Sequence, residues 1–186
     1  MTDREARLLK AAFNVFARYG VSKTTVSDLA AEAGVSRQTM YNMYGGRDEI
    51  LRAVVAFVSE QNRAEVMTAW DAAGTLDEKL SIFCEEGPLA WYDMIHASAH
   101  AADLIEGLHM VAKEQMEVSD AAWVAALADQ IEAHAKHGTG AHSAHDIADL
   151  FYVAAAQAKY RAETRAVLET RLGVLKRSIL ALLGST

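Results

Sequence analysis

The sequence predicts an all-α protein of about nine helices. Alanine is abundant, Pro88 is the single proline, and apolar residues recur at helical spacing between glycine-containing breaks. Alanine has the highest helix propensity of the residues, whereas proline interrupts helices. With 52% hydrophobic and 23% charged residues, the 186-residue chain can bury a sizeable core. This composition excludes global disorder.

The first 47 residues contain signals for three helices. Residues 3–19 form an amphipathic helix that ends at Gly20. Thr25 and Asp28 form a capping box at the start of a short helix over 26–33. After Gly34, Ser36 caps another short helix over 37–43, which ends at the glycine pair at positions 45 and 46.

The pattern of residues 48–186 predicts longer helices. One begins near Asp48, and Thr75 begins another that is expected to stop at Gly87-Pro88. Residues 89–110 are helical by pattern, with Gly107 as a candidate break, and Ser119 is a candidate cap for a helix over 120–136. Residues 137–143 indicate a loop. Residues 144–183 are helical, and their length favours two helices over one.

Two short helices joined by a tight glycine turn indicate a helix-turn-helix. Met40 lies one turn from the apolar residues beneath the second helix, so its outer side holds Arg37, Gln38, Tyr41 and Asn42. Arginine suits the acceptor pair of guanine, and glutamine or asparagine suits adenine. This side of the helix is therefore predicted to read DNA bases.

The segment LLKAAFNVFARYGVSKTTVSDLAAEAGVSRQTMYNMYGGRDEILRAVV resembles the DNA-binding head of the TetR/AcrR family of transcriptional regulators. The resemblance covers about residues 4–57. It implies a helix-turn-helix DNA-binding domain over residues 1–47 and a helical ligand-binding and dimerisation domain over 48–186. A competing hypothesis, that the chain is an enzyme, is not favoured, because we find no nucleophile elbow, phosphate-binding glycine loop or completed metal-ligand set.

The resemblance implies a role for individual residues of the head. The residues at positions where the family contacts phosphates are Thr25, Ser36, Tyr41 and Arg47. The residues at base-reading positions are Arg37, Gln38, Thr39 and Asn42, and Ser27 matches a position that reads bases in some members. Two features depart from the family: Met43 replaces the usual His or Tyr, and Gly45-Gly46 precedes Arg47.

A head of this size makes few contacts with DNA, so a homodimer on a palindromic operator is expected. Residues 144–183 are the predicted dimer interface, as the resemblance also implies. Two apolar stripes are candidates for it: Ala148, Phe151, Tyr152, Ala155 and Ala156, and Val167, Leu168, Leu172, Leu175, Ile179 and Leu182. Alternatively, these stripes face the core of their own subunit.

The body is expected to bind a small, mostly apolar effector that releases DNA, which makes the protein a repressor by resemblance. The predicted pocket lining is Trp91, Ile95, Trp123 and Phe151, although each of these side chains also suits an ordinary core.

The alternative is a metal- or redox-sensing body. His96 and His100 are four residues apart on one helix, and four further histidines surround the loop at positions 134, 137, 142 and 145. No second cysteine or arranged carboxylate completes either set, and nothing near Cys84 in the sequence would stabilise a thiolate. We therefore predict no cofactor and no metal.

The net charge of −7 divides unevenly between the two parts of the chain. Residues 1–60 hold eight basic and seven acidic residues, and residues 61–186 hold ten basic and eighteen acidic residues. The acidity thus belongs to the body, and a near-neutral head remains compatible with DNA because phosphate contact depends on local charge. No membrane-spanning run or secretory signal is recognised, which predicts a cytoplasmic protein.

Overall fold

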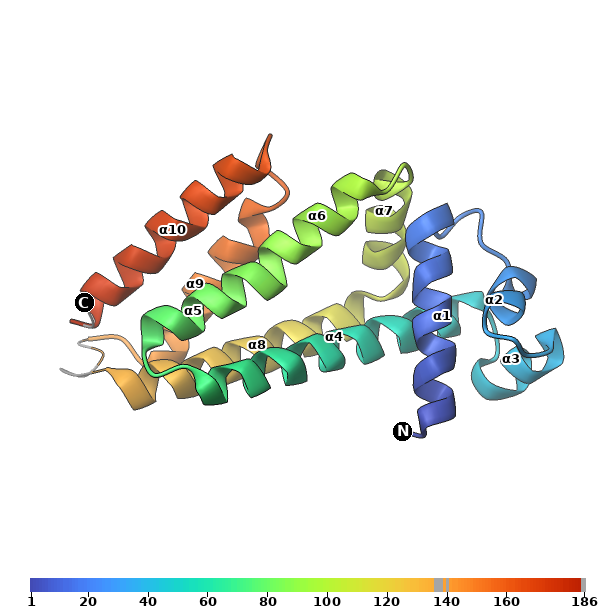
Figure 1. Ribbon diagram of the computed structural model, residues 1–186, viewed down its shortest axis with the longest axis horizontal. Helices are drawn as coiled ribbons and strands as arrows, with labels where there is room; N and C mark the ends of the chain where they lie inside the picture. The colour runs from blue at the N-terminus through green and yellow to red at the C-terminus, as the bar shows by residue number, and fades with distance from the viewer. Residues whose placement is uncertain (136–138, 140, 185–186) are drawn as a thin grey trace. The chain divides into compact units, whose positions relative to one another are not determined.

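The computed structural model describes residues 1–135, 139 and 141–184 (Figure 1). Within this part of the chain every regular element is a helix, so the predicted all-α fold is confirmed. The helices α5 (Leu76–Cys84) and α6 (Ala90–Ala97) are joined without interruption by a π-helical turn, η1 (Glu85–Leu89). When this run is counted as one helix, the described residues contain nine helices.

The chain forms two compact units. The first comprises Met1–Gln61 and Met94–Ser119, and the second comprises Asn62–Asp93 and Asp120–Thr186. Three helices contribute residues to both units: α4 (Arg47–Ala72), α6 and α8 (Lys113–His134). Among the described residues, no helix has the length and apolar character needed to cross a bilayer.

The first unit begins with the three short helices of the head, α1 (Asp3–Tyr19), α2 (Val26–Glu32) and α3 (Arg37–Tyr44). Side-chain caps at Thr2, Thr25 and Ser36 begin them, because each hydroxyl accepts a hydrogen bond from an amide that has no partner within the helix. These starts agree with the sequence prediction.

The helix α7 (Ala101–Val111) packs against α1 within the same unit. The backbone amide of Ser22 donates to Asp103 Oδ2 over 3.0 Å, and Ser98 Oγ donates to the Ala17 carbonyl over 2.9 Å. A Cβ atom at Gly107 would lie 2.6 Å from Val21 Cβ. The candidate break at Gly107 is therefore wrong: this glycine allows close approach of α7 to Val21, and the break falls after Ala97 instead.

The predicted helix end at Gly87-Pro88 is also wrong. Proline has no amide hydrogen and its ring collides with an ordinary α-turn, but the wider turn of η1 contains Pro88 and the helix continues. The Ala90 amide bonds to the Glu85 carbonyl, and Asn62 Nδ2 donates to the Glu86 carbonyl over 2.9 Å.

Ser119 does not begin a helix, since α8 already starts at Lys113 and the Met116 amide bonds to the Ala112 carbonyl. The predicted loop over 137–143 includes residues 137, 138 and 140, which lie outside the described residues. After it, α9 (Ala144–Ala158) and α10 (Arg165–Leu182) are the two helices predicted over 144–183.

An aromatic cluster occupies the centre of the second unit. Phe83 lies 5.2 Å from Trp123, 5.6 Å from Phe151 and 6.1 Å from Tyr152, measured between ring centroids. Trp70 meets Trp123 edge to face, and its indole donates to the Lys79 carbonyl. Edge-to-face contacts of this kind add to the stabilisation that burial of the rings provides.

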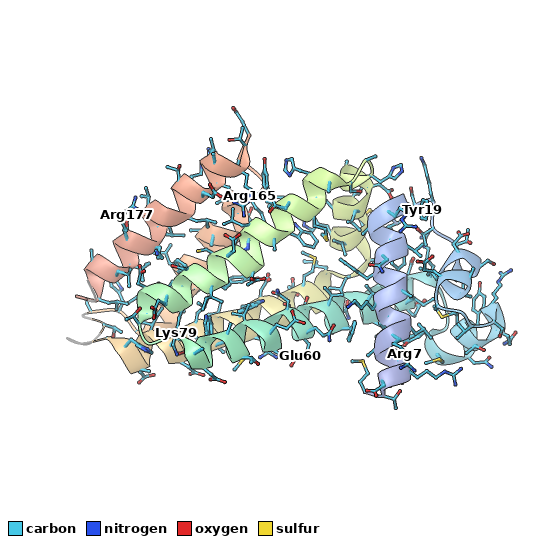
Figure 2. The ribbon with its side chains drawn as sticks, in the orientation of Figure 1. Arg7, Tyr19, Glu60, Lys79, Arg165 and Arg177 are labelled. Atoms are coloured by element: carbon cyan, nitrogen blue, oxygen red, sulfur yellow. The ribbon has the colours of Figure 1, made fainter. Side chains whose placement is uncertain are left out.

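The helix α10 packs against α9 and α5 in this unit. Arg165, labelled in Figure 2, begins α10, and its guanidinium binds carboxylates of Glu85, Asp93 and Glu169. These ion pairs connect the start of α10 to η1 and α6.

Most of the two predicted dimer stripes face this core. The residues buried in their own subunit are Ala148, Phe151, Ala155, Leu168, Leu172 and Ile179. Their assignment to a subunit contact is therefore wrong, because α9 and α10 first bury their apolar faces against α5 and each other. The exposed large apolar residues of the same two helices are Leu150, Val153, Val167, Val174 and Leu182, of which only Val167 and Leu182 belong to the predicted stripes.

We predict that Gly107→Ala destabilises the protein although alanine is the better helix former. The added methyl group collides with the buried Val21 side chain, and overpacking of this kind costs about 1–3 kcal/mol. Gly173→Ala in α10 is the matched control, because its Cβ would meet only Arg177 Nη1 at 3.5 Å. Urea unfolding should show a loss for the first variant and a gain of about 0.5–1 kcal/mol for the second. Equal gains would contradict the close approach at Gly107.

Candidate nucleic-acid interface

A tight turn joins α2 to α3 in the first unit (Figure 1). Gly34 has a φ of +66°, a conformation that residues with a side chain rarely adopt, and the Val35 amide bonds to the Ala30 carbonyl over 3.0 Å. The turn directs α3 across α2, and Leu29 and Met40 are both fully buried. Because Met40 anchors one side of α3, the opposite side remains exposed.

The exposed side of α3 carries the four residues predicted from the sequence to read bases or lie beside them: Arg37, Gln38, Tyr41 and Asn42. They form two pairs spaced four residues apart. Arg37 Nη2 donates to the Tyr41 hydroxyl over 3.3 Å, and the guanidinium carbon lies 5.3 Å from the tyrosine ring centroid. Gln38 Nε2 donates to Asn42 Oδ1 over 2.8 Å. Each pair restricts the side chains that would face DNA.

The N-terminus of α3 is suited to an anion. Ser36 Oγ accepts a hydrogen bond from the Thr39 amide over 3.0 Å and lies 2.8 Å from the Thr39 hydroxyl. The first turn reads Arg37-Gln38-Thr39, so the positive end of the helix dipole is reinforced by a cation.

The N-terminus of α2 differs, because an acidic side chain already occupies it. The Thr25 hydroxyl and amide both donate to Asp28 Oδ2, and these hydrogen bonds hold the pKa of Asp28 below its usual value. Asp28 is therefore ionised at neutral pH and would repel a phosphate from these amides. A phosphate contact from the Thr25 hydroxyl would have to break its hydrogen bond to Asp28. Ser27, two residues further on, is exposed.

Arg47 begins α4 and is engaged by its neighbour. Its Nε and Nη2 atoms both lie 3.1 Å from Asp48 Oδ1. A phosphate contact from Arg47 would have to displace this carboxylate. Gly45 ends α3 with a φ of +95°, and Met43 is exposed on the same helix. Of the positions that the resemblance implies for phosphates, Thr25 and Arg47 are thus each engaged by a neighbouring carboxylate.

The predicted effector lining is distributed between the two units. Trp91, Trp123 and Phe151 belong to the second unit, and Ile95 belongs to the first. Trp123 and Phe151 are buried in the aromatic cluster, whereas Trp91 is half-buried beneath the Lys159 ammonium. Their role in binding an effector remains a prediction.

Neither a metal nor a redox site gains support within the described part of the chain. Residues 1–135, 139 and 141–184 contain no group of three metal-ligating side chains, and His137 lies outside them. Burial raises the pKa of the Cys84 thiol to about 12, so the reactive thiolate is scarce at neutral pH.

Two groups of residues were missed by sequence reasoning. Ser98, Asp103 and Gly107 attach α7 to the head, and only a glycine inside a helical pattern hinted at this close packing. The second is Lys159, which lies over the Trp91 ring. Nothing in the sequence indicated this contact, because a lysine at a helix end is ordinarily a surface residue.

A three-helix head with a tight turn, a buried anchor under the third helix and a polar exposed side defines a helix-turn-helix protein. Comparison with known proteins shows which family the head resembles. Residues 8–54 match the model of bacterial regulatory proteins of the tetR family. The match is confined to the head, and it agrees with the resemblance seen in the sequence.

Relatives by sequence are regulators rather than enzymes. The HTH-type transcriptional regulator YezE of Bacillus subtilis is 32% identical over 94 residues, which cover 50% of this chain and 48% of YezE. SrpR of Pseudomonas putida, also an HTH-type transcriptional regulator, is 42% identical over 54 residues, which cover 29% of this chain and 25% of SrpR. The chain thus matches less than half the length of these relatives.

Solved structures extend the similarity of the fold to the body. A TetR-family transcriptional regulator from Streptomyces coelicolor aligns with a TM-score of 0.66 at 18% identity and covers 100% of this chain and 91% of its own. The reduced form of NemR from E. coli aligns with a TM-score of 0.68 at 14% identity, covering 94% and 96%. At such identities the similarity concerns the fold alone.

We predict that Ser36→Asp separates the capping role of this residue from a phosphate contact. Aspartate caps a helix as well as serine does, so the free energy of unfolding should change little, whereas Ser36→Ala should lose about 1 kcal/mol. The added negative charge should nevertheless abolish DNA binding, because it would face a phosphate. Urea unfolding and fluorescence anisotropy with labelled duplex DNA measure the two effects. Undiminished binding by Ser36→Asp would remove Ser36 from the interface.

Proposed function

We propose that the protein is a ligand-responsive repressor that binds a palindromic operator as a homodimer. The observation that carries this proposal is the exposed side of α3, where two paired sets of hydrogen-bonding side chains lie opposite the buried Met40. Residues 1–47 would bind DNA, and residues 48–186 would dimerise and bind the effector.

Each residue of the head has a proposed role in this complex. Arg37, Gln38, Thr39 and Asn42 would contact bases, with Ser27 as an additional contact from α2. Thr25, Ser36, Tyr41 and Arg47 would contact phosphates. Arginine recognises guanine through two parallel hydrogen bonds, and the amides of glutamine and asparagine recognise adenine in the same way. The Arg37–Tyr41 contact orients the guanidinium and the phenol together.

A dimer is needed because one recognition helix contacts few base pairs. Two heads that lie one turn of DNA apart provide the contacts that specific binding at physiological salt requires. The exposed apolar residues of α9 and α10 support dimerisation within residues 144–183, since monomers seldom expose such a set on adjacent helices.

The effector would act through the equilibrium between two conformations of the dimer. A small, mostly apolar molecule would bind the body more tightly in the conformation that does not fit the operator. The factor by which the effector lowers operator affinity equals the factor by which the operator lowers effector affinity. The aromatic side chains near α6 and α8 support an apolar ligand, with Trp91, Ile95, Trp123 and Phe151 as the proposed contacts.

The proposed DNA binding is tested by selection of bound sequences from random duplex DNA. We expect the wild-type protein to enrich a palindrome and Arg37→Ala to lose the preference at the base pair that Arg37 reads, a loss of about 1–3 kcal/mol in discrimination. Arg18→Ala is the matched control, because Arg18 also stacks on a tyrosine of the first unit but lies outside α3. Failure of the folded wild-type protein to enrich any sequence at low salt would overturn the proposed function.

The proposed dimer interface is tested by placing a charge on it. Leu150, with 62% of its surface exposed, and Val118, with 66% exposed, are both apolar residues at the surface, but only Leu150 lies on α9. We expect Leu150→Lys to give monomers in sedimentation velocity experiments and to weaken operator binding, because a buried unpaired ammonium opposes association. Val118→Lys should remain a dimer. Identical sedimentation of the two variants would place the interface elsewhere.

A further inference from the structure

A cation and three aromatic side chains gather in the second unit, next to the aromatic cluster. Lys159 directly follows the last residue of α9, and its Nζ atom lies 5.2 Å from the ring centroids of both Trp91 and Tyr160. Tyr152, whose ring centroid lies 6.1 Å from that of Phe83, is two turns earlier on α9. An ammonium is thus held between two rings at the edge of an apolar core.

The ammonium has no carboxylate partner of its own. Lys159 forms no salt bridge with any described residue, in contrast to Lys176, whose Nζ lies 2.8 Å from Asp77 Oδ1. The Asp120 carboxylate on α8 acts electrostatically on the Lys159 ammonium and favours its charged form. The same carboxylate, however, accepts a hydrogen bond of 2.5 Å from the Tyr152 hydroxyl. This arrangement leaves a half-buried positive charge that no described carboxylate binds in a salt bridge and that Asp120 compensates only in part.

A second donor lies beside the ammonium. The indole Nε1 of Trp91 is buried, and no described residue offers it an acceptor at hydrogen-bonding geometry. Burial raises the pKa of the neighbouring Tyr160 phenol, and its interaction with the Trp91 N–H only partly opposes this rise. Buried donors without an acceptor are costly and uncommon in folded proteins, so an oxygen from a bound molecule would satisfy both groups.

The charge is retained at a cost to stability. Burial lowers the pKa of Lys159 to about 8, and the Asp120 carboxylate only partly opposes this effect. Since the pKa in the unfolded chain is higher, the folded protein gains stability as the pH rises from about 8 toward the unfolded value. A neutral side chain of the same length would avoid this cost, and residues that reduce stability are often found in binding sites.

We propose that Lys159 and Trp91 bind the carboxylate group of a small organic acid. The ammonium would pair with one carboxylate oxygen and the indole N–H would donate to the other, while the rings of Tyr160 and Trp91 would cover an aromatic or short aliphatic body. The inference deepens the proposed function. It rests on that function only for the claim that the bound acid is the effector. It changes the expected effector from an apolar molecule to an amphipathic anion.

The NMR signal of the Trp91 indole N–H can report binding directly. The chain has three tryptophans, so a ¹⁵N-labelled sample of the full-length protein gives three indole cross-peaks, and Trp91→Phe assigns the relevant one. Phenylacetate and hexanoate are titrated to millimolar concentration, each against its neutral amide, phenylacetamide or hexanamide. Lys159→Met keeps the aliphatic stem and removes the charge. Lys79→Met is the matched control, because Lys79, labelled in Figure 2, is a partly buried lysine of the same unit that bonds to Gln130.

We expect the carboxylates, and not the amides, to shift the Trp91 cross-peak in the wild-type protein and in Lys79→Met. Binding to Lys159→Met should be about tenfold weaker or more, because a hydrogen bond to a charged group contributes that much. Three results would overturn the proposal: no shift with either carboxylate, equal shifts with acids and amides, or equal affinity for Lys159→Met. The last would make Lys159 merely a packing residue.

The same samples distinguish this inference from the proposed function. Carboxylate binding by a protein that enriches no operator would leave the anion site standing and overturn the regulator. Operator binding that no carboxylate affects, together with an unmoved Trp91 cross-peak, would leave the regulator standing and overturn the anion site.

Discussion

The packing of α2 against α3 is the contact on which the DNA-binding surface depends. Leu29 and Met40 are fully buried in the first unit, and the positive φ of Gly34 makes the turn between their helices possible. Once Met40 faces inward, the helical repeat places Arg37, Gln38, Tyr41 and Asn42 outward. A polar residue at position 40 would thus disturb both the core of the head and the orientation of its exposed side.

The head does not form a compact unit by itself. A domain of fewer than about 50 residues buries little apolar surface, and here residues 94–119 complete the unit. The contacts of Val21, Ser22 and Ala17 with α7 attach a later segment of the chain to the end of α1. Any movement of α7 would therefore act directly on α1.

The second unit combines a filled aromatic core with an unneutralised cation at its edge. Phe83, Trp123 and Phe151 pack against one another and suit a stable core. Lys159 is different, because the desolvation of its ammonium opposes folding, while the rings of Trp91 and Tyr160 orient that ammonium. The contrast separates residues that stabilise the unit from Lys159, which we propose as part of an anion-binding site.

The sequence by itself determined the all-α class, the starts of the capped helices and the exposed side of α3. Each of these depends on residues within a few positions of one another: a hydroxyl and the amide three residues on, or a glycine at a turn. Only the tertiary structure decided that the helix continues through Pro88, that Gly107 is a point of close approach, and which apolar stripe of α9 and α10 is buried. It alone also brought Lys159 between Trp91 and Tyr160. Those features arise from contacts between segments distant in sequence, which local periodicity does not encode.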